Sequence, residues 1–319
     1  MRRQTALFTF AALSSACFSS QLDELAAGAF ACGKDAGDAP CPDGQTCSSN
    51  RCETDDTLPT VTIGDPVDGR AATFVEGGPD IDQTVQFSIG NFELVDPNVT
   101  SEHVFGQGSI IVSVDGEIVQ TLTSGSVTGG REVGVVVPNV VGAHRISVRL
   151  MRNDGTPYDH AAATERNLFW LSDGQPRVAV TSPWPGEVFS LDQQEIEVKL
   201  GVVNFELLPA EIEPALGQGH AHVHYDKPFP ECPELDDGCD SDYIVIVDSP
   251  INETNTFAVP SEGAVAILPP EASAREVEIT AILRHLHHLP YRLPDQGEGV
   301  TFPPMEGDIV FDSITISRQ

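Results

Sequence analysis

Residues 217–226 read Gly-Gln-Gly-His-Ala-His-Val-His-Tyr-Asp, and residues 106–115 read Gly-Gln-Gly-Ser-Ile-Ile-Val-Ser-Val-Asp. Each run opens with the same three residues and ends on an aspartate. Between these ends an apolar residue stands at every second position, which is the period of a β-strand with one face on a core. The two runs therefore predict two copies of one strand.

Other pairs of segments extend this likeness into an internal repeat. They keep the same order in both copies: residues 59–63 with 176–180, 91–94 with 204–207, 106–115 with 217–226, 145–152 with 276–284, and 156–158 with 289–291. Five matches in one order indicate tandem modules, which we place at residues 59–172 and 174–319.

Both copies have the composition of β-structure. Short runs rich in β-branched residues, such as 85–89, 110–114 and 133–137, are separated by Gly, Pro, Asp and Asn, and no stretch keeps a helical period. About seven short strands in each copy predict an all-β chain with two Greek-key β-sandwiches. The architecture resembles that of the immunoglobulin-like and fibronectin type III modules of extracellular proteins, although the Cys…Trp…Cys signature of antibody domains is absent.

The N-terminus has the features of an export signal. Arg2 and Arg3 precede a short apolar run, and the small residues 14–16 precede Cys17. This resembles a bacterial lipoprotein signal, in which residues 1–16 are removed and the new N-terminal cysteine carries lipid. Here Ser14 replaces the usual aliphatic residue, and ordinary cleavage after Ala16 also fits. Residues 17–31 are predicted to be a tether.

The seven cysteines fit an exported protein. With Cys17 lipidated, an even number is left for disulfides in an oxidising compartment. Residues 32–52 are too short to have a core of their own and are predicted to be a disulfide knot, with three connectivities open. The segment resembles the small EGF-like knots of bacterial surface lipoproteins, whereas a zinc knuckle is the alternative. The predicted disulfide residues are Cys32, Cys41, Cys47, Cys52, Cys232 and Cys239.

Charge restricts the class of partner. The net charge of −31 would repel a polyanion, so nucleic acid is excluded as a partner. The acidic insertion around Asp236 and Asp240 lacks the spacing of an EF-hand loop, and calcium binding and a solvated turn both remain open.

Histidine is the strongest chemical signal. Six of the nine histidines lie in two patches, 220–224 and 285–288. His220, His222 and His224 stand where the first copy has Ser109, Ile111 and Ser113, so this type of fold does not require histidine there. Residues i and i+2 of a strand share a face about 7 Å apart, which lets two imidazoles approach one metal ion.

Strand pairing should bring the second patch to the same end of the sheet. Strand 220–224 is expected to pair antiparallel with a strand at residues 277–288, with its histidines facing outward. Alternation favours His288 as a further ligand, and His285 and His287 are the alternatives. Imidazoles without thiolate suit Cu(II), Zn(II) or Ni(II). Surface or pH-sensitive histidines without metal, and a catalytic zinc centre, are the other hypotheses. The single histidines His103, His144 and His160 are expected at the surface or in turns.

These features predict a non-catalytic binding protein. The chain is expected to be exported and held at the cell envelope by N-terminal lipid, or secreted, and to bind Cu(II) or Zn(II) in its second sandwich. The alternative is an adhesion or scaffolding protein that presents its modules to a protein partner without metal. Trp170 and Trp184 flank the boundary between the modules and are expected to pack there.

Overall fold

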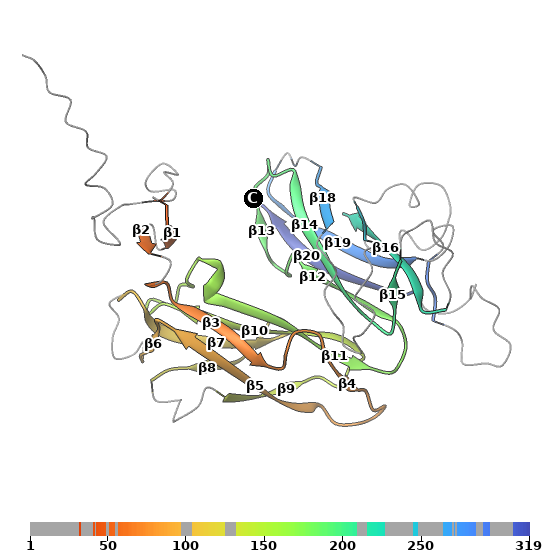
Figure 1. The fold of residues 1–319 in the computed structure, drawn as a ribbon, viewed down its shortest axis with the longest axis horizontal. Helices are drawn as coiled ribbons and strands as arrows, with labels where there is room; N and C mark the ends of the chain where they lie inside the picture. Colours follow the sequence, from red (N-terminus) through yellow and green to blue (C-terminus); the bar gives the residue numbers. More distant parts are fainter. Residues whose placement is uncertain are drawn as a thin grey trace, which may run out of the picture. The chain divides into compact units, whose positions relative to one another are not determined.

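The computed structural model places the chain in two compact units, Met1–Leu58 and Pro59–Gln319 (Figure 1). It describes residues 32, 41, 43–48, 51–54, 57–96, 104–124, 132–208, 216–226, 245–247, 264–269, 271, 273–284, 290–293 and 309–319. No helix in this described part has the length and apolar character needed to cross a bilayer.

The first unit contains an antiparallel hairpin of β1 (Gln45–Ser48) and β2 (Arg51–Thr54). Disulfides join Cys32 to Cys47 and Cys41 to Cys52, with Cα–Cα distances of 5.8 and 5.5 Å. These covalent links stabilise a segment that is too short to bury a hydrophobic core of its own.

The second unit begins with a sandwich of two sheets. One sheet has the order β3-β5-β9, and the other has the order β4-β11-β10-β7-β6, with β8 also paired to β7. A short 3-10 helix, η5 (Ala161–Ala163), precedes β11. The strands are β3 (Thr60–Asp65), β4 (Arg70–Thr73), β5 (Ile81–Gly90), β6 (Glu93–Leu94), β7 (Gln107–Val114), β8 (Glu117–Leu122), β9 (Glu132–Val137), β10 (Gly142–Met151) and β11 (Thr164–Ser172).

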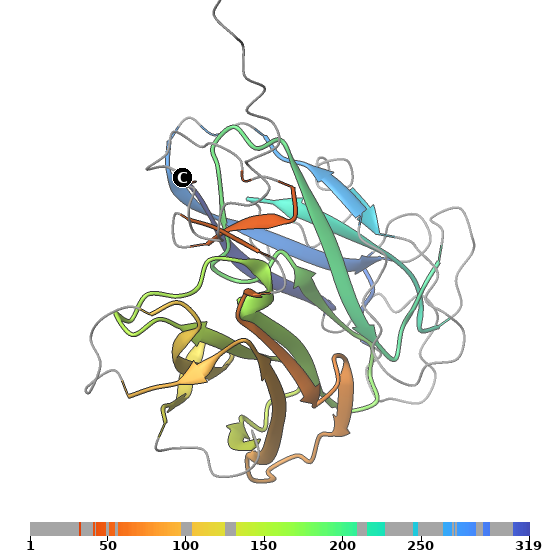
Figure 2. The same ribbon diagram turned by 60° about the vertical axis from the view of Figure 1, so that its left-hand side comes forward.

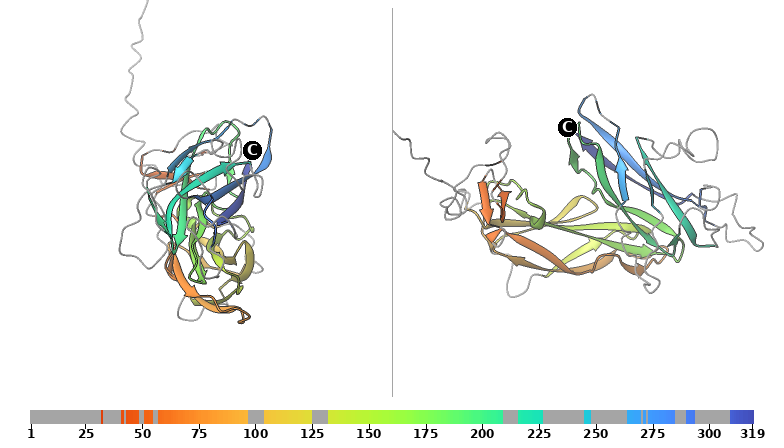
Figure 3. Two further views of the ribbon diagram at one scale, coloured as in Figure 1. Left: turned by 90° about the vertical axis from the view of Figure 1, so that its right-hand side faces the viewer. Right: turned by 45° about the horizontal axis from the view of Figure 1, so that its top comes forward.

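A second sandwich repeats this order strand for strand. Its sheets are β12-β14-β18 and β13-β20-β19-β16-β15, with β17 paired to β16. The strands lie in two layers (Figures 2 and 3). They are β12 (Arg177–Ser182), β13 (Val188–Phe189), β14 (Glu195–Val203), β15 (Glu206–Leu207), β16 (Gln218–Tyr225), β17 (Val245–Val247), β18 (Ala264–Ile267), β19 (Arg275–Arg284) and β20 (Phe311–Arg318). The chain is therefore all-β, with tandem sandwiches of the immunoglobulin-like and fibronectin type III-like kind.

Special backbone positions confirm the repeat. Gly106 and Gly217 have φ values of +78° and +79°, a left-handed conformation that favours glycine. Each glycine N–H donates to a tyrosine hydroxyl, Tyr158 at 3.0 Å and Tyr291 at 3.1 Å. Equivalent tyrosines thus hold the loop that leads into β7 in the first copy and the loop that leads into β16 in the second.

Each sandwich has its own core between its sheets. In the second, Ala221, Val223 and Tyr225 of β16 contribute to one cluster with the apolar residues of β19, including Val277 and Ile279. Their alternation along the strands, as the sequence predicted, leaves every second residue of β16 on the opposite face of the sheet.

The two sandwiches meet inside the unit Pro59–Gln319. Trp170 is fully buried in a small cluster with Ala179 and Val203, and Trp184 packs against the same cluster, as expected for the module boundary. Arg145 Nη2 of the first sandwich donates to Asp312 Oδ2 of the second at 2.7 Å. This apolar cluster and ion pair form what we call the module joint.

Candidate metal site

The histidine strand β16 is an interior strand of its sheet, with β17 on one side and β19 on the other. Its antiparallel register with β19 places His220 opposite Arg284, His222 opposite Ile282 and His224 opposite Thr280. The predicted pairing is confirmed, because the start of the histidine strand lies beside the end of β19.

The three imidazoles are buried. His220 is 3% exposed, and His222 and His224 are fully covered. They lie on the face away from the core, as predicted, but the expectation of an outward, open face is wrong. Ile282 and Arg284 on the adjacent strand β19 are also only 1% exposed, so this part of the sheet is covered on both faces.

Ring spacing fits two imidazoles at one metal ion. The ring centroids of His220 and His222 are 5.1 Å apart, and those of His222 and His224 are 6.2 Å apart. Two imidazoles bound to one ion at about 2.0–2.1 Å have centroids roughly 5 Å apart at a tetrahedral angle, and more than about 6 Å apart only on opposite sides of the ion. The His220–His222 pair therefore matches a shared ion, and a complete centre needs ligands beyond this pair.

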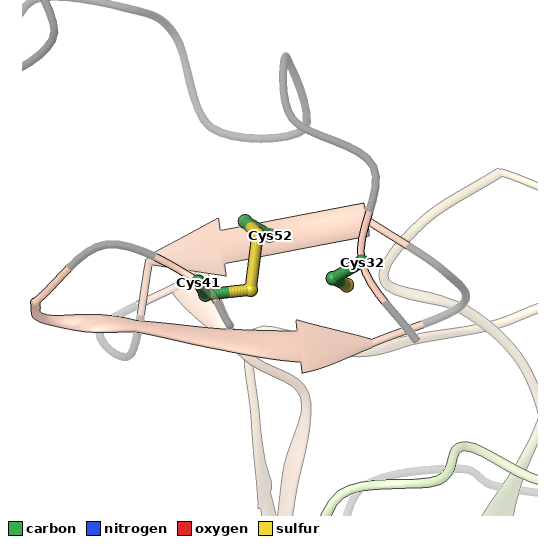
Figure 4. A group of neighbouring side chains, drawn as sticks. All are labelled: Cys32, Cys41 and Cys52. Atoms are coloured by element: carbon green, nitrogen blue, oxygen red, sulfur yellow. A yellow bond between two sulfur atoms is a disulfide. The ribbon is translucent and has the colours of Figure 1, made fainter. Parts of the chain in front are cut away.

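The full row does not form a closed three-histidine centre. Among the described residues, the only group of three ligand residues whose ligand atoms all lie within 4.8 Å of one another is Cys32, Cys41 and Cys52. Figure 4 shows these three side chains, with the sulfur of Cys41 bonded to that of Cys52. Cys32 is bonded to Cys47, so these thiols are consumed by disulfides and the zinc-knuckle alternative is wrong.

Polar side chains continue from the row across the sheet. Thr280, which pairs with His224, is fully buried, and its Oγ1 lies 2.7 Å from Ser313 Oγ on β20. At the other end the buried guanidinium of Arg284 opposes further positive charge near His220. His222 and His224 are the members of the row farther along the strand from that cation.

The remaining predicted ligands and linkage sites lie outside the described residues. These are His285, His287, His288, Cys17, Cys232, Cys239 and the acidic insertion that contains Asp236 and Asp240. In sequence, the second histidine patch follows directly on Arg284, the residue paired with His220.

The single histidines were expected at the surface or in turns, which is wrong for His144, a buried residue of β10. His160 lies in the connection before η5 but is buried there, and His103 lies outside the described residues. His144 is 5% exposed and His160 is 6% exposed. His160 Nε2 lies 2.6 Å from the carbonyl oxygen of Pro59. His144 shares the strand alternation of Ile146 and Val148, which are fully buried, and this parity was the signal in the sequence that could have placed it inside.

His144 is held by acceptors at both ring nitrogens. Nδ1 lies 2.7 Å from Asp115 Oδ2, and Nε2 lies 2.9 Å from the carbonyl oxygen of Val140. Burial lowers the pKa of His144, but its hydrogen bonds to Asp115 and Val140 and the charge of Asp115 outweigh this, so the pKa is raised. The pKa of Asp115 is lowered, because hydrogen bonds from His144 and the Arg145 N–H outweigh desolvation. These contacts favour the imidazolium form of His144 beside the Asp115 carboxylate.

Comparisons with known proteins show only broad likeness. No protein-family model matches the chain, and no curated protein matches it either. The fibronectin(III)-like modules of CbhA from Clostridium thermocellum align at 11% identity and a TM-score of 0.24, over 81% of this chain and 94% of that one.

Two further solved structures align at similar levels. The BSP domain of a biofilm associated protein shows 14% identity and a TM-score of 0.19, over 82% of this chain and 30% of that one. A putative membrane anchored protein from Corynebacterium diphtheriae shows 10% identity and a TM-score of 0.22, over 83% of this chain and 63% of that one. The assignment of the sandwiches therefore rests on their strand order and registers.

Proposed function

We propose that this chain is a non-catalytic binding protein outside the cytoplasm, whose second sandwich binds a transition metal at the row His220, His222 and His224. One observation carries the proposal. Three buried imidazoles occupy one strand of a sheet whose equivalent strand, in the same chain, has Ser109, Ile111 and Ser113. The fold forms without histidines there, so the row in the second copy has a role other than folding.

The donor set favours Cu(II) or Zn(II). Neutral imidazoles without thiolates suit these ions, and the rings of His220 and His222 have the spacing that a shared ion requires. His288, with His285 and His287 as reserves, would supply further ligands from the segment after Arg284. The burial of the row supports binding without catalysis, because a catalytic centre must admit a substrate at an open position.

The disulfides indicate a location outside the cytoplasm. The bonds Cys32–Cys47 and Cys41–Cys52 of the first unit are of a kind that persists in oxidising compartments. We propose that lipid on Cys17 holds the protein at the membrane of the cell envelope. Replacing Cys17 by serine should then move the protein from the membrane fraction to the soluble fraction, and an unchanged distribution would contradict the anchor.

Calorimetric titration with Cu(II) and Zn(II) tests the metal proposal. The sharpest variant gives β16 the residues of the first copy: His220→Ser, His222→Ile and His224→Ser. His144→Gln is the control, since it removes a histidine outside the row. We expect saturable binding of one ion per chain that the control keeps and the triple variant loses. Equal binding by the triple variant, or no binding by the parent chain, would contradict the proposal.

The second candidate function is a scaffold that presents both modules to a protein partner. The module joint favours it, because Arg145, Asp312 and the cluster around Trp170 connect the sandwiches directly. A scaffold would capture its partner equally well with a chelator present and with the triple variant. Loss of capture in both conditions would assign the binding to the metal site instead.

A further inference from the structure

A pocket at the module joint is lined by no residue of the histidine row. It has a volume of about 810 Å³, within the size range of small-molecule binding sites. The first sandwich contributes the connection between β9 and β10 and the start of β10. The second contributes the turn at Trp184 and the strand β20.

The joint holds the two sides of this pocket together. Asp312 Oδ2 accepts hydrogen bonds from Arg145 Nη2 at 2.7 Å and from the Val180 N–H at 2.8 Å. Arg145 Nη2 also lies 3.3 Å from the carbonyl oxygen of Val180. Because the two contacts of Arg145 cross between the sandwiches, the pocket is formed before any ligand arrives, which lowers the entropic cost of binding.

Two aromatic rings line the pocket, and the fold does not require them. The Gly69 N–H donates to the Leu168 oxygen, and the equivalent Gly186 N–H donates to the Thr315 oxygen. Counting from these pairs, Trp184 and Phe311 stand where the first copy has Val67 and Thr164. Phe311 is 39% exposed, although burial is the usual state of a phenylalanine.

The charged groups around the pocket are largely paired within the protein. Arg145 pairs with Asp312, His144 with Asp115, and the pocket-lining Arg177 with Asp173 at 2.7 Å. Glu276 adds one more carboxylate to the lining. Together with the chain's net charge of −31, this arrangement disfavours an anionic ligand.

We propose that this pocket binds a neutral saccharide. The C–H face of a sugar ring packs on an aromatic ring, and its hydroxyl groups both donate to carboxylates and accept from guanidinium groups. Trp184 and Phe311 supply the rings, and Arg177 and, beside the other end of β20, Glu276 supply the polar groups. The site is independent of the metal proposal, because it uses no residue of the histidine row.

Titration of the full chain with maltotriose, cellotriose and chitotriose tests the proposal, with the anionic trigalacturonate for comparison. Binding is followed by calorimetry and by the emission of the two tryptophans, Trp170 and Trp184. We expect at least one neutral trisaccharide to bind saturably. Phe311→Ala should weaken that binding about tenfold, the loss of one ring contact. Ile118→Ala is the control, since Ile118 is an exposed apolar residue of β8 outside the pocket, and it should leave the affinity unchanged.

Phe311→Ala decides the outcome because its side chain is exposed, whereas Trp184→Ala also removes packing from the module joint. Binding of none of the three neutral trisaccharides would overturn the proposal. So would equal affinity in the Phe311→Ala variant, or binding of trigalacturonate alone. The variant that lacks the histidine row should bind the saccharide as the parent chain does.

Discussion

His144 is a buried group whose charge depends on the pH of the medium. Both of its ring nitrogens face oxygen acceptors, and only the protonated imidazole can donate from both. The chain therefore stabilises the imidazolium form in a place where histidine is usually neutral. This pair lies at the lining of the joint pocket, beside Arg145.

The raised pKa of His144 predicts a specific pH dependence of stability. Its contribution is complete below the unfolded value of about 6.5 and is lost as the pH rises through the folded pKa. Urea unfolding at several pH values between about 6 and 9 should show the parent chain losing free energy of unfolding relative to His144→Gln. Parallel curves for the two proteins would contradict the imidazolium assignment.

At single residues, the sequence predicted faces better than exposure. Alternation placed Ala221 and Val223 on the core side and the histidines on the other face, and this is confirmed. It did not reveal that the other face is also covered, because alternation tells the two faces of a strand apart but not what packs on each of them. His144 was expected at the surface or in a turn because it is a histidine. Its alternation with Ile146 and Val148 indicated the core side instead, and the structure places it there.

Within the element β16, a glycine sets the fit of the histidine strand against β19. A Cβ atom on Gly219 would collide with the carbonyl oxygen of Arg284, and the same holds for Gly108 and Met151 in the first copy. Backbone atoms cannot move aside without disturbing the ladder. This close approach fixes the register that brings His220 beside the end of β19.

Gly219→Ala should therefore destabilise the chain by more than about 2 kcal/mol. It should also lower metal affinity, because the histidine row shifts relative to β19. Gly134→Ala is the matched control, since a Cβ atom on this strand glycine meets nothing within 4 Å. Chemical denaturation of both variants measures the difference, and equal midpoints would show that the close approach does not control the register.

The repeat allowed the strand pairing to be predicted from sequence. Two copies of one pattern gave the order of strands and the antiparallel partner of β16, since both copies carried the same landmarks. The match of residues 145–152 with 276–284 was one residue out at its end, because Met151, not Arg152, is the counterpart of Arg284. Arg152 and Arg284 looked equivalent in sequence. The close approach of each strand glycine to a backbone carbonyl instead makes Met151 the counterpart of Arg284.

For the whole molecule, the module joint is the feature that sequence patterns could not predict. Arg145 and Asp312 are 167 residues apart and belong to no shared motif. Burial raises the pKa of Asp312, although the charge of Arg145 acts in the opposite direction. The disulfide connectivity was likewise open, because spacing alone allows three arrangements of four cysteines.

Arg145→Met should loosen the joint, because it leaves the Asp312 carboxylate without its cation. We expect the calorimetric unfolding of the sandwiches to separate into two transitions. The free energy of association between the sandwiches should weaken by about 1–3 kcal/mol. Arg70→Met is the control, since its ion pair with Asp65 is solvent-exposed and such pairs contribute about 0–1 kcal/mol. One unchanged transition in Arg145→Met would mean that the apolar cluster alone holds the modules.

The central claim, a metal ion held by imidazoles of the second sandwich, is tested most directly by X-ray absorption of the Cu(II)-loaded chain after weakly bound ions are removed. The account predicts nitrogen ligands at about 2.0 Å with the scattering pattern of at least two imidazole rings. The variant with His220→Ser, His222→Ile and His224→Ser should lose this signal. An oxygen-only first shell, or an unchanged spectrum in that variant, would contradict the claim.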